Sequence, residues 1–395
     1  MTICFISDHP FCERDGKFYS GGGIPADMLY RYVREDSQLV VVGRRTEKQN
    51  MTLSSIPNST FHLLENYSKP LDLYLKRGRI KKEFYDIIKQ VDAVILRVPS
   101  GFAPILLPLC RELDKPIAVE VCGRTFDSLW YHGSLAGKLL ALFGEYSCKK
   151  TVKAANYVLY VSQEYLQSAY PHKEDAITVA CSNVALDSEI KDNILENRIR
   201  KIDDQQRNSY TIGQIGNLSM KYKGYSVALK ALKIVKESGY NVNYEIVGAG
   251  DASGVIKEAK KLKIDDKLVI RGKMNHSDIS IFLQNIDIYI HPSYTEGLPR
   301  AVVEAMSNAT PCLTSNAGGT SELLPEEWKH NPGDYKKLAA DILKMLGDKY
   351  RMKDSAIANF EKAREYYPDV LNSRRTNYYD LFFKNISSHD RKRNF

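Results

Sequence analysis

The sequence predicts an α/β protein made of two doubly wound parallel sheets. Short, nearly continuous apolar runs such as Thr2–Ser7 and Ile117–Val121 alternate with helical patterns over most of the chain. This is typical of parallel strands covered by helices on both faces. A polar stretch without aromatic residues, 188–209, interrupts the alternation, which then resumes. The length of 395 residues suffices for two domains that each bury a full core.

Each half of the chain has its own series of expected strands, with helical patterns between them. In the first half we expect strands at Thr2–Ser7, Leu39–Val42, Ala93–Leu96, Ile117–Val121 and Tyr157–Val161, and helices at Met28–Val33, Arg79–Ile88 and Leu135–Ala155. In the second half we expect strands at Thr211–Ile215, Asn243–Val247, Lys267–Ile270, Asp287–Ile290 and Cys312–Thr314, and helices at Ser226–Glu237, Gly254–Leu262, Ser277–Gln284 and Arg300–Ser307.

These series predict the domain boundaries. We expect an N-terminal Rossmann-like domain over residues 1–187, a linker over 188–208, a C-terminal Rossmann-like domain over 209–365, and a helical tail over 366–395. The tail is rich in tyrosine and phenylalanine, and we expect it to cross back to the N-terminal domain. In open α/β sheets the ligand lies beyond the carboxyl ends of the strands, so the cleft between the domains is the expected site.

Composition narrows the class of protein further. No apolar run approaches the roughly 20 residues of a membrane span, and the N-terminus resembles a strand more than a signal peptide. The seven cysteines contain no C-x-x-C pair, which favours free thiols in a reducing cytoplasm. No D-x-D, H-x-H or H-E-x-x-H spacing is present, so no metal site is expected.

The net charge of +8 is partly concentrated in one segment, the basic cluster of residues 76–82. Its cations are interleaved with apolar residues, so two interpretations remain open. The segment is either a helix that lies on an anionic bilayer, or an ordinary amphipathic helix packed on the N-terminal sheet.

The segment Ile290–Ser307, IHPSYTEGLPRAVVEAMS, carries the strongest chemical signal. Pro299 suits a first helical position, Gly297 lets a ligand approach the backbone, and the helix start favours a phosphate. Glu296 before the helix and Glu304 within it suit hydrogen bonds from sugar and ribose hydroxyls. Alternatively, Glu296 caps the helix and Glu304 pairs with Arg300 at i, i+4.

This segment resembles the E-x7-E motif of family 4 of the retaining glycosyltransferases, which have the GT-B fold. The neighbouring motifs agree in order and spacing: GNLSMKYKG at Gly216–Gly224, EIVGAG at Glu245–Gly250 and SNAGGTSEL at Ser315–Leu323. The resemblance implies metal-independent transfer of a sugar, with retention, from a UDP- or GDP-linked donor to a glycan or lipid-linked acceptor. It further implies synthesis of a bacterial surface polysaccharide, at the inner leaflet of the membrane and without a nucleic acid partner or an added cofactor.

The resemblance also implies roles for individual residues. Glu296 would contact the donor sugar, Glu304 the ribose, and Lys223 the diphosphate. The remaining positions would line the donor site as backbone or loop residues: Gly297, Leu298 and Pro299 at the helix start, Gly318 and Gly319 in the next loop, Asn217 after the first C-terminal strand, and Gly22 and Gly23 in a glycine loop after the first strand of the chain.

Two positions depart from the family pattern. Asn217 replaces an arginine that helps to hold the diphosphate, a loss that Lys221 or Arg300 would have to offset. Cys122 stands where many members have a histidine, which leaves Arg124 and Asp127 as the polar candidates on that loop. Asp127 has a second interpretation as a helix cap.

Several other functions remain open at this point. Gly248, Gly250 and Gly254 follow a strand as in a Rossmann dehydrogenase, but Arg271 follows the next strand where the companion acid is expected. A GT-B epimerase or phosphorylase would share the fold, and a non-catalytic sugar-nucleotide-binding protein would tolerate the two departures. His9 is expected at the surface, and His291 is expected to be structural.

Overall fold

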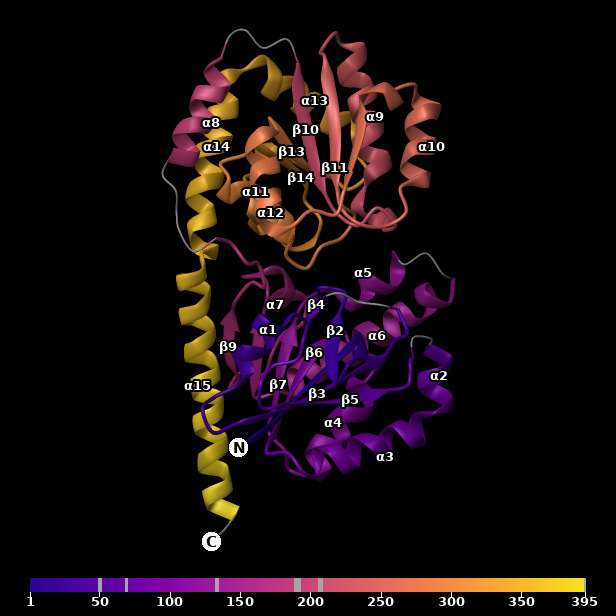
Figure 1. Ribbon diagram of the computed structural model, residues 1–395, viewed down its shortest axis with the longest axis vertical. Coiled ribbons are helices and arrows are strands. Elements are labelled where there is room, and N and C mark those ends of the chain that lie inside the picture. The colour runs from indigo at the N-terminus through magenta and orange to yellow at the C-terminus, as the bar shows by residue number, and fades with distance from the viewer. Residues whose placement is uncertain (49–51, 68–69, 132–134, 188–192, 205–208, 394–395) are drawn as a thin grey trace.

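The computed structural model describes residues 1–48, 52–67, 70–131, 135–187, 193–204 and 209–393. Within these ranges the chain forms two α/β domains, one above the other in Figure 1, each built on its own β-sheet. The predicted fold class is confirmed. The central strands are covered on both faces of the sheet, as expected. Val94 and Ile95 are neighbours whose side chains point to opposite faces, and both are fully buried.

The N-terminal sheet has β1 near its middle. The strand order is β4-β2-β1-β6-β7-β8-β9, and β3 and then β5 extend the sheet from β1. All pairs are parallel except those of β2, which lies antiparallel to the second half of β1 and to β4. The strands are β1 Thr2–Arg14, β2 Lys17–Ser20, β3 Gln38–Arg45, β4 Thr52–Leu53, β5 Ser59–Leu64, β6 Ala93–Val98, β7 Ile117–Val121, β8 Tyr157–Tyr160 and β9 Ile177–Ala180.

The C-terminal sheet is parallel throughout, in the order β12-β11-β10-β13-β14-β15. Ile212 of the central strand is level with Tyr244 on one side and with Ile288 on the other. The strands are β10 Tyr210–Ile215, β11 Val242–Val247, β12 Leu268–Gly272, β13 Ile288–His291, β14 Cys312–Ser315 and β15 Lys329–His330.

Helices connect the strands and cover the sheets (Figure 1). The helices are α1 Ala26–Leu29, α2 Pro70–Leu75, α3 Arg77–Ile88, α4 Ala103–Glu112, α5 Thr125–Trp130, α6 Leu135–Ala154, α7 Tyr165–Ala169, α8 Asn193–Asp203, α9 Tyr225–Glu237, α10 Ser253–Leu262, α11 His276–Asn285, α12 Arg300–Ser307, α13 Tyr335–Gly347, α14 Lys349–Ala363 and α15 Pro368–Arg393. Short 3₁₀ turns are η1 Tyr30–Tyr32, η2 Lys221–Lys223, η3 Asp265–Lys267, η4 Gly318–Glu322, η5 Glu326–Trp328 and η6 Arg364–Tyr366.

The start of the chain differs from the expectation. The first strand does not end at Ser7 but continues as β1 to Arg14, with a register shift between Ile6 and Pro10. It then turns back as β2, so the loop of Gly22 and Gly23 follows β2 and not the first strand.

The helix of the predicted linker and the last helix of the chain each pack against one domain. Within the stretch predicted as a linker, α8 packs against the C-terminal domain, and its Arg198 donates to the carbonyls of Leu283 and Ile286. The ends of that stretch, 188–192 and 205–208, lie outside the described residues. The last helix, α15, runs along the side of the N-terminal domain (Figure 1), where Arg375 donates to the Ser182 carbonyl.

Among the residues that the structure describes, no helix combines the length and the apolar character that crossing a bilayer requires.

Candidate active site

A cavity of about 670 Å³ lies between the two domains. It opens beyond the carboxyl ends of β7, β10 and β13, as expected for doubly wound sheets. The N-terminal domain contributes Pro99, Cys122, Gly123, Arg124, Asp127 and Tyr131, and the C-terminal domain contributes Ser219, Met220, Lys221, Tyr222, Thr295, Glu296 and Gly297.

Direct contacts hold the two walls of this cavity together. Asp127 accepts hydrogen bonds from the hydroxyls of Tyr165 in its own domain and Thr295 in the other, both at 2.9 Å. The Glu322 carboxylate accepts from the first backbone N–H groups around the start of α7, including that of Gln163 at 2.6 Å. Asp127 is therefore a link between domains and not a helix cap. The residue before α5 is Arg124, which makes no side-chain cap bond.

Glu296 lies at the centre of a buried charged cluster. Its Oε1 accepts from Lys223 Nζ at 2.7 Å and from His291 Nε2 at 2.8 Å. Burial alone would raise the pKa of Glu296, but the charge of Lys223 and the hydrogen bond from His291 hold that pKa well below its usual range. The carboxylate is ionised and can only accept, so His291 carries its proton on Nε2, while Nδ1 faces the hydroxyl of Tyr289 at 3.1 Å.

This cluster separates the interpretations that the sequence left open. The residue that precedes α12 is Pro299, which provides no side-chain cap, so the alternative in which Glu296 caps the helix is wrong. Pro299 also lies one residue before the first helical position. His291 is fully buried and fixes the orientation of Glu296, in agreement with the structural role expected for it.

Lys223 reaches Glu296 because two loops lie close together. Gly224 has a φ of +73°, and a Cβ at this position would lie 1.9 Å from the carbonyl oxygen of Pro292. Only glycine allows the loop after β10 to press on the loop after β13 in this way. Burial lowers the pKa of Lys223, but the neighbouring Glu296 carboxylate raises that pKa by more than burial lowers it. The lysine therefore stays charged.

Close backbone contacts also surround the start of α12. A Cβ on Gly318 would lie 2.0 Å from the Glu296 carbonyl oxygen, and a Cβ on Gly319 would lie 1.8 Å from that of Gly297. Gly297 faces the N-terminal domain, where its Cβ would lie 2.4 Å from the carbonyl oxygen of Cys122. Leu298, which follows Gly297 in the sequence, is buried. The glycines thus allow backbone to meet backbone at the cavity wall.

Glu304 lies apart from Glu296. It lines a separate, small cavity of about 50 Å³ together with His276 of α11. Burial raises its pKa, while the positive charge of Arg300, one turn earlier on α12, lowers it. The two glutamates of the motif therefore do not line the same cavity in this structure.

The other loop candidates are held by their own domains. The Asn217 side chain accepts from the backbone N–H of Ser219 at 2.9 Å and so shapes the loop after β10. Gly23 packs against the ring of His9, which is partly buried, and Gly22 has a φ of +96°. Gly23 thus lies beside β1 and Gly22 beside Thr52 of β4, and both lie outside the set of residues that line the cavity.

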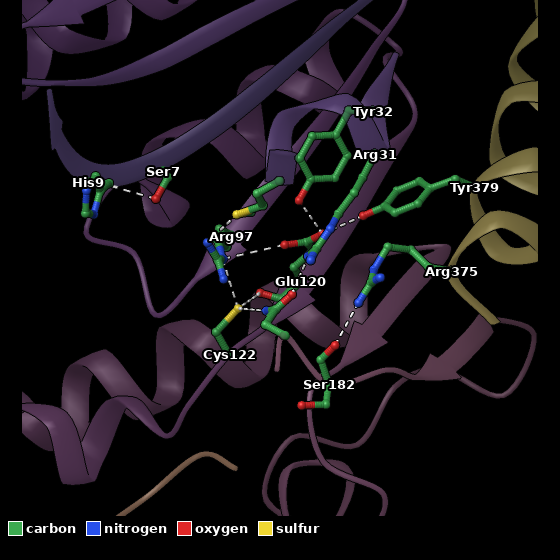
Figure 2. Close-up of polar contacts among 12 residues, drawn as sticks. Ser7, His9, Arg31, Tyr32, Arg97, Glu120, Cys122, Ser182, Arg375 and Tyr379 are labelled. Atoms are coloured by element: carbon green, nitrogen blue, oxygen red, sulfur yellow. Dashed lines mark hydrogen bonds and ion pairs between the residues drawn. The ribbon is translucent and has the colours of Figure 1, made fainter. Parts of the chain in front are cut away.

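Behind Cys122 lies a buried polar network that the sequence analysis did not identify (Figure 2). Arg97 Nε donates to the Cys122 sulfur at 3.0 Å and lies 3.5 Å from the Glu120 carboxylate. Glu120 in turn accepts from the hydroxyls of Tyr32 at 2.7 Å and Tyr379 of α15 at 2.6 Å. The cavity wall is thereby tied to the last helix. The available signal was a charged residue inside each of the apolar strands β6 and β7.

Comparison with known proteins agrees with this geometry. A family model described as glycosyl transferases group 1 matches residues 196–363. The chain is 31% identical over 371 residues to Protein CapJ of Staphylococcus aureus, with 93% of this chain and 92% of that protein covered. The chain belongs to the group 1 glycosyltransferases. It is also 31% identical over 155 residues to the amylovoran biosynthesis glycosyltransferase AmsK of Erwinia amylovora, covering 37% of this chain and 38% of AmsK.

Solved GT-B structures share the whole architecture of this glycosyltransferase. Anabaena HepE, solved in complex with UDP, has a TM-score of 0.64 at 16% identity, covering 98% of this chain and 100% of HepE. WaaG, a glycosyltransferase involved in lipopolysaccharide biosynthesis, has a TM-score of 0.66 at 14% identity, covering 96% and 99%. These likenesses confirm the GT-B fold.

Family membership rules out the dehydrogenase alternative. The structure gives its glycines another purpose, since a Cβ on Gly248 would lie 1.8 Å from the Gly216 carbonyl oxygen and one on Gly250 would lie 2.5 Å from the Asn217 side chain. These glycines let the loops after β10 and β11 approach each other.

Proposed function

We propose that this protein transfers a sugar, with retention of the anomeric configuration, from a UDP- or GDP-linked donor to a glycan or lipid-linked acceptor in the synthesis of a capsule or another surface polysaccharide. The observation that carries the proposal is the Lys223–Glu296–His291 cluster, whose Glu296 lines a cavity between the domains. The relation to CapJ and AmsK supports the polysaccharide context, and UDP bound to HepE supports a uridine donor.

In the proposed reaction the acceptor hydroxyl attacks the anomeric carbon on the face from which the diphosphate leaves. The new bond joins the acceptor oxygen to the anomeric carbon, and the bond from that carbon to the diphosphate oxygen breaks. A donor phosphate oxygen takes the acceptor proton, so the chain needs no separate base. The protein supplies positioning and charge stabilisation.

Each side chain of the cluster then has a task. Both hydrogen bonds to Glu296 fall on Oε1, and we assign Oε2 to the hydroxyls of the donor sugar. Lys223 offsets the charge of the leaving diphosphate, together with the N–H groups at the start of α12. Lys221, exposed and lining the cavity, is the cation we assign to the role of the arginine that Asn217 replaces.

The remaining candidates extend the proposed donor site. Glu304 holds the ribose, with Gly297, Leu298 and Pro299 at the phosphate end and Gly318 and Gly319 in the adjacent loop. Gly22 and Gly23 belong to the loop that approaches the acceptor. We propose that the reaction takes place in the cytoplasm, at the inner face of the membrane where a lipid-linked acceptor is available.

A panel of nucleotides and nucleotide sugars tests the donor. Thermal unfolding is followed with UDP, GDP, ADP, their sugar conjugates and NAD, each with Mg²⁺ and with EDTA. We expect one nucleotide series to stabilise the protein in EDTA, and Glu304→Ala to abolish that effect. If no nucleotide sugar stabilises the protein, or if the shift needs Mg²⁺, the proposal is wrong.

Product analysis separates the remaining alternatives. With donor and a mixture of glycan acceptors, a transferase forms a glycoside and releases the nucleotide. A phosphorylase would instead need inorganic phosphate and form a sugar phosphate, and an epimerase would convert the donor without any acceptor. A binding protein would be stabilised by the donor and form no product.

A further inference from the structure

Helix α6 carries an exposed apolar stripe. Leu139, Leu142, Phe143 and Tyr146 have exposed fractions of 75%, 72%, 63% and 65%. Their spacing of three and four residues places them on one face of the helix. Large side chains of this kind usually lie in a core, and a contiguous group of them on the surface marks an interaction site.

The same face is positively charged. Lys138, Lys149, Lys150 and Lys153 are exposed on α6. The acidic residue between positions 137 and 154 is Glu145, which is buried and accepts hydrogen bonds from Arg124 and Tyr170. An apolar stripe flanked by lysines, on a helix whose sequence has no acidic residue besides the buried Glu145, is complementary to an anionic lipid surface.

The end of α5 continues this surface. Trp130 is 40% exposed, and its ring lies 5.2 Å from the ammonium group of Lys138. Tryptophan suits the boundary between water and lipid because its ring is apolar and its N–H is polar.

The basic cluster of residues 76–82 lacks these properties. Lys76 and Arg79 pair with Glu65 at 2.9 Å each, and Lys81 lies 3.6 Å from Glu112. The apolar residues of α3, including Phe84, are buried against the N-terminal sheet. The structure thus favours the interpretation of α3 as an ordinary amphipathic helix.

We propose that the protein docks on an anionic bilayer through the α6 face, defined as Leu139, Leu142, Phe143 and Tyr146 with the four exposed lysines of α6. This rests on the proposed function, which places the reaction at a membrane, and deepens it by naming the surface that meets the lipid. Docking itself requires neither donor nor transfer, so the two proposals can fail separately. The α5 helix packs against α6, and its Asp127 lines the cavity between the domains. In Figure 1, α5 lies at the edge of the N-terminal domain nearest to the C-terminal domain. Docking on this face brings the cavity close to the lipid surface.

Vesicle co-sedimentation of the full chain tests the proposal. The vesicles contain phosphatidylcholine alone or phosphatidylcholine with phosphatidylglycerol. We expect binding to the anionic vesicles, and at least tenfold weaker binding for the combined Leu142→Ser and Phe143→Ser variant. Lys149→Glu with Lys150→Glu should weaken binding to a similar extent and should leave the melting temperature unchanged.

Two matched controls keep the outcome interpretable. Ile281→Ser removes an apolar side chain that is 59% exposed on α11, and Lys81→Glu with Lys82→Glu changes the charge of α3. Both should bind vesicles like the wild type. Equal binding by the wild type and the Leu142→Ser, Phe143→Ser variant would overturn the proposal. It would also be overturned if the wild type binds no vesicles and forms a dimer in light scattering that this variant converts to a monomer. Nucleotide-sugar binding measured on the same samples distinguishes this failure from failure of the proposed function.

Discussion

The contact between Gly297 and Cys122 provides a test of domain closure. A Cβ at position 297 would lie 2.4 Å from the Cys122 carbonyl oxygen and 3.1 Å from the Gly123 Cα, whereas ordinary contacts begin near 3.4 Å. Both neighbours are backbone atoms of the other domain, so no side chain can rotate away. Gly297→Ala must therefore move the two walls of the cavity apart by about 1 Å.

The expected cost follows from this displacement. A misplacement of about 1 Å between groups that must meet in the transition state reduces the rate by about 10²-fold, which corresponds to about 2.7 kcal/mol of lost transition-state stabilisation. We expect this loss in kcat for sugar transfer. Nucleotide affinity should fall much less than kcat, because the added Cβ meets the backbone of Cys122 and Gly123, whereas the other proposed contacts to the nucleotide come from the C-terminal domain.

Two further glycines serve as controls. A Cβ on Gly254 of α10 meets nothing within 4 Å, so Gly254→Ala should have wild-type activity. Gly319→Ala places a Cβ against the backbone of its own domain and should lower the melting temperature instead. The reasoning is refuted if Gly297→Ala retains kcat within twofold of the wild type.

Three further predictions concern donor binding and stability. Lys223→Ala should weaken binding of the nucleotide sugar by about 10- to 150-fold in calorimetry, the effect of one charge-assisted hydrogen bond, whereas Lys257→Ala on the surface of α10 should leave it unchanged. Burial lowers the pKa of His330 to about 4 from 6.5, so between these pH values the unfolded chain binds a proton that the folded protein does not. Stability should therefore fall by about 3 kcal/mol as the pH drops from 6.5 to 4, and urea unfolding of His330→Leu at pH 7.5 and pH 5 should show less of this loss. Tyr379→Phe removes a 2.6 Å hydrogen bond to a buried carboxylate and should cost about 1.5–3 kcal/mol in urea unfolding. The hydroxyl of Tyr378 is buried without a hydrogen-bond partner in the described structure, so Tyr378→Phe should leave the free energy of unfolding almost unchanged. Equal losses of stability for the two variants would contradict the role given to the network.

The C-terminal domain was largely predictable because its signals are local. Strand β13 is buried on both faces and therefore appears as a continuous apolar run. The segment that runs from β13 into α12 combines Gly297, Pro299 and two glutamates at fixed spacing, and α12 begins at Arg300, as predicted.

The elements that were missed depend on distant contacts or contain residues that favour other structures. The helix α4 contains Pro108, which removes a backbone donor and discourages a helical prediction. The extension of β1 passes through Asp8, whose carboxylate is satisfied by the Ser100 hydroxyl and the Gly101 N–H more than 90 residues away. No local pattern contains that information.

Within the site, spacing did not predict how the candidate residues lie relative to one another. The pairing of Glu296 with Lys223 spans 73 residues and exists because Gly224 lets two loops touch. Glu304 faces α11 because it lies one turn inside a helix, while Glu296 lies in the loop before that helix. The link from Asp127 to Thr295 joins two domains and has no signature in either segment.

The position of α15 has a consequence for synthesis of the chain. The N-terminal domain is completed by residues made last, since Tyr379, Phe382 and Phe383 are buried against it. The ribosome adds about 5–20 residues per second, so about 190 residues of further translation take about 10 to 40 s. Throughout that interval Glu120 lacks one of its hydroxyl partners and the apolar groove for α15 is open to water. A nascent chain that stalls before residue 379 therefore exposes an aggregation-prone apolar groove in a domain whose own sheet is already complete.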